Sequence, residues 1–458
     1  MIHKYCVYGL YILCDIGSGA IHLIDEGTFN ALDRVQCASD IDDIEDAEIA
    51  DDLRELVLRG ELFAPDNTIG LGTLAEGQAM TKANEQYKKS PLPIAGDVVK
   101  AICLHVSHDC NLRCRYCFAG AGAYGGDRSL MTAETGRAAI DFLIAHSGTR
   151  HNLEVDFFGG EPTLNWDVVV EVVRYAREIE RGHGKNIRFT LTTNGILLND
   201  EKTAFINANM DNVVLSIDGR REVNERMRGG YDVIVPIYKK FAASRGDRSY
   251  YLRGTYTSFN KDFAADALHL ADLGFDKISV EPVVCGAEEE YALKLSDVDA
   301  LSRQYDLLAA EMLQREQDGR GFSFFHFNLD LDGGPCIVKQ VSGCGAGMEY
   351  VAISPVGDIY PCHQLVGIDE FYLGNISIGF RRVFSDVSVL TKSECQSCWA
   401  KFYCGGGCHA AAYFQNGDVT KPYALGCALM KKRVETAIYM QAARFLHHDS
   451  FHHNARQE

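Results

Sequence analysis

The chain has 458 residues, 47% of them hydrophobic and 24% charged, which is enough for two or three globular domains with ample core. Its formal net charge of −18 excludes nucleic acid and anionic membrane as main partners, because phosphate groups are bound by basic surfaces. The sequence has no apolar run of about 18 residues and no signal-peptide cleavage pattern, so we expect a cytoplasmic protein.

Residues 1–64 are expected to form a small domain. Two β-rich runs, residues 3–16 and 19–25, are joined by a Gly-Ser-Gly turn and followed by a short helix. A second helix is predicted within residues 43–63, and its closing Arg-Gly-Glu-Leu-Phe resembles the exit of a winged helix into a wing strand. The acidity of this helix argues against DNA binding. Residues 65–97 contain Pro and Gly and are predicted to be a linker.

From residue 98 to about 325 the pattern changes to alternating strands and helices. The helix that begins after Thr132 has that residue as its predicted N-cap. Repeated βα units predict a parallel sheet or barrel, with ligands at the C-terminal ends of the strands. Six strands are predicted, at residues 98–107, 153–160, 187–195, 211–219, 250–258 and 277–284.

The sixteen cysteines are far too many for chance core positions, and their clustering indicates metal. A cytosolic chain does not keep so many cysteines as disulfides. Five scattered cysteines are interpreted as small buried hydrophobes. The other eleven fall into two groups, Cys110, Cys114 and Cys117, then Cys336, Cys344, Cys362, Cys395, Cys398, Cys404, Cys408 and Cys427.

The first group has C-x3-C-x2-C spacing and is followed directly by Phe118. A closed zinc or iron–sulfur site takes four ligands, whereas a catalytic metal keeps one position open. A zinc loop with a distant fourth ligand and reduced structural cysteines are the alternatives. Polar or glycine residues end the following strands, namely Gly159, Gly160, Glu161 and Pro162, then Thr193 and Asn194, Ser216 and Asp218, and Arg253.

Together these motifs resemble the radical S-adenosylmethionine (SAM) superfamily. The resemblance implies an α/β fold with a partial (β/α)6 TIM-like barrel over residues 98–325. The first three cysteines would then hold a [4Fe–4S] cluster whose fourth iron binds the amino and carboxylate groups of SAM. It also implies that the glycine-rich turn contacts the SAM amino group, and that Ser216 and Arg253 hold its carboxylate and ribose region. The other strand-end residues and Phe118 are expected around the same cofactor.

The second group has the spacing of the SPASM domain of radical SAM peptide-modifying enzymes, although zinc ribbons also use C-x2-C. By this resemblance residues 326–440 hold two auxiliary clusters, giving three [4Fe–4S] clusters in all. Cys336 lies outside the seven-cysteine motif, and without it the first auxiliary cluster keeps an iron for a substrate thiolate. Residues 441–458 are predicted to be a disordered tail. The implied ligand sets are Cys336, Cys344, Cys362 and Cys408 for the first cluster, and Cys395, Cys398, Cys404 and Cys427 for the second.

The N-terminal module together with the Tyr-Pro-Cys-His-Gln-Leu-Val-Gly stretch, residues 360–367, resembles SCIFF-type maturases, which act on a short cysteine-rich peptide. The implied reaction is thioether formation. The 5′-deoxyadenosyl radical abstracts a hydrogen from an acceptor residue, a peptide cysteine sulfur bonds that carbon, and the auxiliary clusters take the surplus electron. A strand edge of the N-terminal module would bind the leader of the ribosomally made precursor by β-augmentation. A ferredoxin or flavodoxin would donate electrons.

Two other functions compete with this prediction. Anaerobic sulfatase maturases share the barrel and the SPASM domain, but in that family an Asp serves as base where this chain has His363. His can still take a proton near neutral pH, so His363 is a candidate base alongside an Asp or Glu elsewhere. The non-enzyme alternative is an iron–sulfur or zinc regulatory protein. Such a protein would not need the strand-end residues that are expected to contact SAM.

Overall fold

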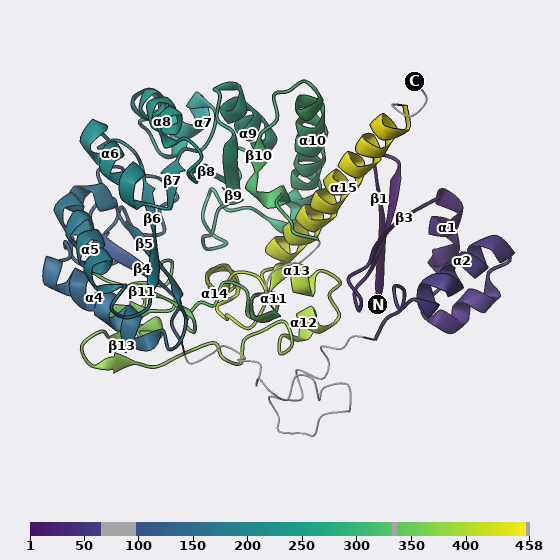
Figure 1. The fold of residues 1–458 in the computed structure, drawn as a ribbon, viewed down its shortest axis with the longest axis horizontal. Helices are drawn as coiled ribbons and strands as arrows, with labels where there is room; N and C mark the ends of the chain where they lie inside the picture. Colours follow the sequence, from purple (N-terminus) through teal and green to yellow (C-terminus); the bar gives the residue numbers. More distant parts are fainter. Residues whose placement is uncertain (66–97, 332–336, 455–458) are drawn as a thin grey trace.

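The computed structural model describes residues 1–65, 98–331 and 337–454 (Figure 1). Its N-terminal unit begins with an antiparallel sheet of β1 (Ile2–Val7), β2 (Leu10–Asp15) and β3 (Ile21–Ile24), in that order. The sequence predicted one β run where β1 and β2 stand. The chain reverses between them at Tyr8 and Gly9, whose φ angles of 47° and 81° suit a tight hairpin turn.

Helices α1 (Glu26–Ala31) and α2 (Ala47–Leu58) complete this unit, with short 3-10 turns at Leu32–Arg34 and Ala38–Asp43. The predicted wing strand at residues 59–63 is wrong, because these residues form turns and bends. Gly60, at φ 71°, ends the helix, and Leu62 is then buried in the small core beneath α2. The predicted linker lies outside the described residues except for Pro65.

The predicted parallel sheet is confirmed. Its strands, β4 to β9, are hydrogen-bonded in chain order and covered by the intervening helices (Figure 1). Thr132 caps α4 by accepting a hydrogen bond from the N–H of Thr135 at 3.2 Å. The strands are β4 (Ala101–Ser107), β5 (Asn152–Gly159), β6 (Asn186–Thr193), β7 (Asn212–Ser216), β8 (Tyr251–Tyr256) and β9 (Lys277–Pro282). The helices are α4 (Ala133–His146), α5 (Trp166–Ile179), α6 (Asp200–Asn209), α7 (Arg221–Met227), α8 (Tyr231–Arg245), α9 (Phe263–Asp272) and α10 (Val298–Gln317).

The sheet continues beyond β4 into the cysteine-rich region. Strand β11 (Tyr350–Ile353) pairs parallel to β4, and β12 (Asp358–Tyr360), β13 (Gly374–Asn375) and β14 (Gly379–Phe380) follow antiparallel. At the other edge β10 (Ser323–Phe324) pairs with β9. The cysteine-rich region is therefore fused to the barrel through main-chain hydrogen bonds, which fixes its position at the first strand.

The remaining helices are mostly short, namely α11 (Ile337–Ser342), α12 (Ser393–Gln396), α13 (Lys401–Cys404), α14 (His409–Asn416) and the long α15 (Ala424–Asn454). The predicted tail is wrong for residues 441–454, which continue α15. Ala443 is buried, and Arg444 pairs with Glu316 of α10 at 2.5 Å, so this part of the helix is held by packing. Residues 455–458 lie outside the described residues.

The N-terminal sheet contacts the cysteine-rich region through β1 and α15 (Figure 1). The ring of His3 stacks on Trp399 with centroids 3.8 Å apart, and its Nε2 lies 2.9 Å from Glu435 Oε1. The Tyr5 hydroxyl donates to the Glu435 carbonyl at 3.1 Å. Across the described ranges, none of the helices is long and apolar enough to cross a membrane.

Candidate active site

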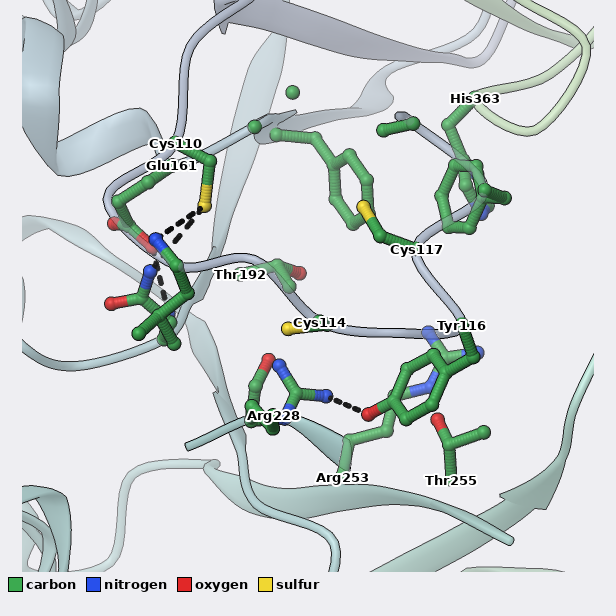
Figure 2. A pocket seen from close by; sticks show the side chains of 18 of the residues that line it. Cys110, Cys114, Tyr116, Cys117, Glu161, Thr192, Arg228, Arg253, Thr255 and His363 are labelled. Carbon is green, nitrogen blue, oxygen red and sulfur yellow. Dashed lines mark hydrogen bonds between the residues drawn. The ribbon is translucent and has the colours of Figure 1, made fainter. Parts of the chain in front are cut away.

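A cavity lies at the C-terminal ends of the barrel strands, where the parallel sheet predicts a ligand site (Figure 2). The loop after β4 contributes the first three cysteines, and the segment after Cys362 closes the cavity from the cysteine-rich region. Of the residues predicted here, Asp218 does not line it. Those that do are Cys110, Cys114, Cys117, Phe118, Gly159, Gly160, Glu161, Pro162, Thr193, Asn194, Ser216, Arg253 and His363.

The cysteine loop carries its three sulfur atoms around one space (Figure 2). The Cys110 sulfur accepts hydrogen bonds from the Leu112 N–H at 3.4 Å and from Asn194 Nδ2 at 3.7 Å. Burial raises the pKa of Cys114 to about 11, and the nearby Arg228 guanidinium acts against that shift. A positive metal centre bound here would stabilise the thiolates that burial disfavours.

The glycine-rich turn after β5 clamps the start of the cysteine loop. A Cβ at Gly159 would lie 2.2 Å from the Ser107 oxygen, and one at Gly160 would lie 2.2 Å from the Asp109 oxygen. The Gly160 N–H donates to Ser107 at 2.7 Å, and the Glu161 N–H donates to Asp109 at 2.8 Å. The glycines are thus required by close approach of two segments of this chain.

Glu161 ties the ends of β5 and β6 together. Its side chain is 1% exposed, and both carboxylate oxygens accept hydrogen bonds. The donors are the Thr193 hydroxyl and the Asn194 N–H, both at 2.8 Å, together with the N–H and hydroxyl of Thr163. Burial raises its pKa, and these hydrogen bonds oppose the shift. The sequence assigned this carboxylate to an ammonium group, whereas the fold already uses it internally.

Asp218 organises the cavity from beneath. It is fully buried and accepts from the Tyr116 hydroxyl at 2.7 Å and from the Thr255 N–H at 3.0 Å. Arg228, at the end of α7, lies 3.4 Å from the same carboxylate and donates to the Tyr116 hydroxyl at 2.7 Å (Figure 2). Tyr116 could have been found from the sequence, because it lies inside the cysteine motif. Nothing in the sequence pointed to Arg228, because only the fold brings α7 to the cavity.

Two charged side chains at neighbouring strand ends face the cavity. Arg253 on β8 has no hydrogen bond or ion pair to its side chain among the described residues. Glu281 on β9, which the sequence reasoning missed, accepts from the Ser279 hydroxyl and contacts His326 Nε2, both at 2.8 Å. Burial disfavours the Glu281 carboxylate, but His326 and Arg253 outweigh burial and hold its pKa below the usual range. The cavity thus contains a free guanidinium beside a fixed anion.

His363 lies at the cavity wall between Phe118 and Phe158, at centroid distances of 5.6 and 4.9 Å. Its Nδ1 lies 3.2 Å from the Tyr350 hydroxyl. Burial, helped by the Arg253 cation, lowers the pKa of His363 to about 3. An imidazole with so low a pKa is neutral at pH 7. It can form hydrogen bonds at the surface of the cavity but is a weak proton acceptor.

The described cysteines of the second group fall into two sets by their electrostatic effects on one another. Burial raises the pKa of Cys362, and the nearby Cys408 and Cys344 raise it further. Cys395 likewise interacts with Cys404, Cys427 and Cys398. Cys336 lies outside the described residues. Within the described chain no three His, Cys, Asp or Glu side chains gather tightly enough to bind one metal ion.

A parallel barrel with an open three-cysteine loop and a cation-lined cavity at its strand ends defines a metal-dependent enzyme of the α/β class. The family model of the Radical SAM superfamily matches residues 104–249. The chain is 30% identical over 333 residues to the mycofactocin maturase MftC of Mycobacterium ulcerans, covering 68% of this chain and 84% of that protein. The chain belongs to the radical SAM superfamily and is one of its peptide maturases, enzymes that use SAM and a [4Fe–4S] cluster.

Solved structures share the fold, among them two with bound S-adenosylmethionine. One is anSMEcpe with bound AdoMet and the Cp18Cys peptide, with a TM-score of 0.61 and 19% identity, covering 75% of this chain and 98% of that one. The other is Streptococcus suis SuiB bound to S-adenosylmethionine, with a TM-score of 0.53 and 17% identity, covering 93% of this chain and 98% of that one. The second likeness extends over nearly the whole chain.

Proposed function

We propose that this enzyme installs thioether crosslinks in a ribosomally made, cysteine-rich precursor peptide of the SCIFF type. In each crosslink a cysteine sulfur would be bonded to a carbon of an acceptor residue. The reaction would take place in the cytoplasm. The related mycofactocin maturase and the peptide-bound anSMEcpe structure support a peptide as the substrate class.

The observation that carries the proposal is that the first cysteine loop and the segment after Cys362 line the same cavity. The first cysteine loop forms one side, and His363 and Gln364, directly after Cys362, form another. A peptide in the cavity would therefore lie between the SAM-binding loop and the first auxiliary set. Thioether formation needs this arrangement, because hydrogen abstraction and removal of an electron act on the same peptide.

The residues at the strand ends suit SAM. Cys110, Cys114 and Cys117 would hold a [4Fe–4S] cluster with one open iron, and the free Arg253 guanidinium would pair with the SAM carboxylate. Ser216, Thr193 and Asn194 would border the ribose and methionine parts. When bound, SAM and this cluster supply the 5′-deoxyadenosyl radical that takes a hydrogen atom from the acceptor residue.

The two C-terminal sets would hold auxiliary [4Fe–4S] clusters, three clusters in all. The first would take Cys344, Cys362 and Cys408, with Cys336 as fourth ligand or a substrate thiolate in its place. The second would take Cys395, Cys398, Cys404 and Cys427. The electrostatic grouping of the described cysteines supports both sets. They would receive the electron released when sulfur bonds to carbon, and a ferredoxin or flavodoxin would exchange electrons with the enzyme.

The free edge of β3 in the N-terminal sheet would bind the leader peptide as an added strand. Among the described residues β3 pairs only with β2, and Leu23 in its middle is 41% exposed. The opposite edge strand, β1, is covered by its contact with Glu435 and Trp399. A leader on β3 would therefore not compete with the contact between the N-terminal unit and the rest of the enzyme.

The test is the mass of a SCIFF-type cysteine-rich peptide after anaerobic incubation with enzyme, SAM and reductant, followed by reduction and thiol alkylation. We expect the loss of two hydrogens and one cysteine that resists alkylation. Formation of an aldehyde with loss of the cysteine sulfur would instead indicate the formylglycine chemistry of sulfatase maturases. Unchanged peptide alongside release of 5′-deoxyadenosine would disprove the thioether proposal for this peptide. Without SAM cleavage in a sample with intact clusters, the regulator alternative would be favoured.

A further inference from the structure

Lys392 is a buried cation in the cysteine-rich region that does not line the cavity. The residue precedes α12 and is 4% exposed, and its Nζ donates to the Gly406 carbonyl at 2.8 Å. Lysine is rarely buried, because removing an ammonium from water is costly unless negative charge compensates it. The compensating charge should therefore lie close to Nζ.

The cysteines around Lys392 would supply that charge as thiolates once they hold a metal centre. Burial raises the pKa of Cys395, Cys404, Cys427 and Cys408, and the Lys392 ammonium acts against the rise at each of them. Cys408 belongs to the first auxiliary set, and the other three belong to the second. The Gly406 carbonyl that binds the ammonium lies two residues from Cys404 of the second set and two residues from Cys408 of the first.

The loop that holds Lys392 connects the two sets. Gly405, Gly406 and Gly407 separate Cys404 of the second set from Cys408 of the first, and all three have positive φ. The N–H groups of Gly406 and Gly407 point to the Cys404 sulfur, while the Gly406 carbonyl holds the ammonium. The chain thus places the ammonium on the short bridge between the two sets.

We infer that Lys392 is a positioning residue whose buried charge raises the reduction potentials of both auxiliary clusters. The inference rests on the proposed auxiliary clusters. A [4Fe–4S] centre with four thiolates is an anion that becomes more negative on reduction, so a fixed neighbouring cation favours the reduced form. Among the described residues the Gly406 carbonyl is the one hydrogen-bond acceptor of the Lys392 Nζ, and Lys392 does not line the cavity.

The electron balance of the proposed reaction explains why such a charge is useful. The acceptor carbon gives a hydrogen atom to the adenosyl group, and the peptide thiol gives up its proton. The sulfur–carbon bond then forms with one electron in excess, and that electron must leave to an oxidant. The auxiliary clusters would be that oxidant, and a cation beside both would favour acceptance of the electron.

The test is an EPR-monitored redox titration of the anaerobic, cluster-loaded enzyme and its variants. K392Q keeps a hydrogen-bond donor for Gly406 and removes the charge, K392M removes both, and K392R keeps the charge. We expect both auxiliary midpoint potentials to fall in K392Q and K392M, and to stay near the wild-type values in K392R. The cluster held by Cys110, Cys114 and Cys117 should not shift in any of them.

The matched control is K421Q, which makes the same charge change at a side chain that is 66% exposed and paired with Asp418. It should leave all potentials unchanged. Unshifted auxiliary potentials in K392Q, or a shift of only one of them, would overturn the inference. Loss of the auxiliary clusters in the neutral variants but not in K392R would support a role for the charge. Loss in K392R as well would overturn it.

Absence of the auxiliary clusters, on which the proposed function depends, gives a different result. In that case the wild-type enzyme itself would show one cluster signal and about four irons per chain after reconstitution. With three clusters present in the wild type, any result with the Lys392 variants concerns Lys392 alone.

Discussion

The cysteine loop of the barrel and the cysteine-rich region beyond residue 337 differ in what surrounds their sulfur atoms. In the barrel, the sulfurs face a cavity together with the guanidinium groups of Arg228 and Arg253 and the amide of Asn194. In the C-terminal region, backbone N–H groups of a glycine-rich loop and the buried Lys392 take that place.

The two groups of cysteines therefore differ in whether they line the cavity. Side chains at strand ends leave an opening where a ligand can bind the metal, and long cations there can reach an anionic cosubstrate. A loop of main-chain donors beside the Cys404 sulfur would stabilise a bound metal centre and a region with little core of its own. The two regions meet along the paired strands β4 and β11 and at the segment that follows Cys362. The following predictions test how far this contrast holds.

The largest effect is expected from C114A in the open loop. Loss of one of three thiolates removes the cluster that binds SAM, so SAM cleavage should fall to background. The measurement is release of 5′-deoxyadenosine under reducing conditions. Iron should decrease by about four atoms per chain while the auxiliary signals persist. Retained SAM cleavage would contradict the assignment of this loop.

C395A in the cysteine-rich region should separate SAM cleavage from thioether formation, which C114A removes together. SAM cleavage should continue at a rate within about threefold of wild type, and thioether product should be lost, because the electron has no acceptor. The melting temperature should also fall by about 5 °C or more, since the cluster crosslinks this region. Normal product formation with fewer irons would show that the second set is structural only.

R253M addresses the free cation of the open site. A charge-assisted pair contributes about 1.5–3 kcal/mol, so the Kd for SAM should rise roughly 10- to 100-fold. Equilibrium dialysis with labelled SAM measures this directly. The control is R248M at an exposed position nearby in the chain. An unchanged Kd would mean that the guanidinium faces the peptide instead of SAM.

The smallest effect concerns acid stability of the barrel interior. His105 is fully buried, and burial, with His108 and His363 nearby, holds its pKa well below the ordinary 6.5. The unfolded chain therefore binds more protons below pH 6.5, and stability falls as the pH is lowered from there. In H105Q the free energy of unfolding, measured by denaturant titration, should depend less on pH. The slope should decrease by up to about 1.4 kcal/mol per pH unit. H183N, at an exposed histidine, should leave the slope unchanged.

Local sequence patterns were sufficient to predict much of the fold of this protein. The six barrel strands, the cap at Thr132 and the cysteine spacing all depend on neighbours in the chain, and the structure has the predicted strands and cap. The break between β1 and β2 and the continuation of α15 were not predicted. The turn at Tyr8 and Gly9 divides a segment whose composition is typical of one strand. The contact of Arg444 with Glu316 holds a segment whose composition is typical of a disordered tail.

The sequence by itself determined the chemistry, because three cysteines at fixed spacing after a strand and strand-end polar groups are local features of a barrel. Only the tertiary structure decided what each group does. It placed Glu161 in a clamp between strands, brought Arg228 and Glu281 to the cavity, and set Lys392 between two groups of cysteines. These roles depend on contacts between residues far apart in the chain, and no spacing in the sequence encodes them.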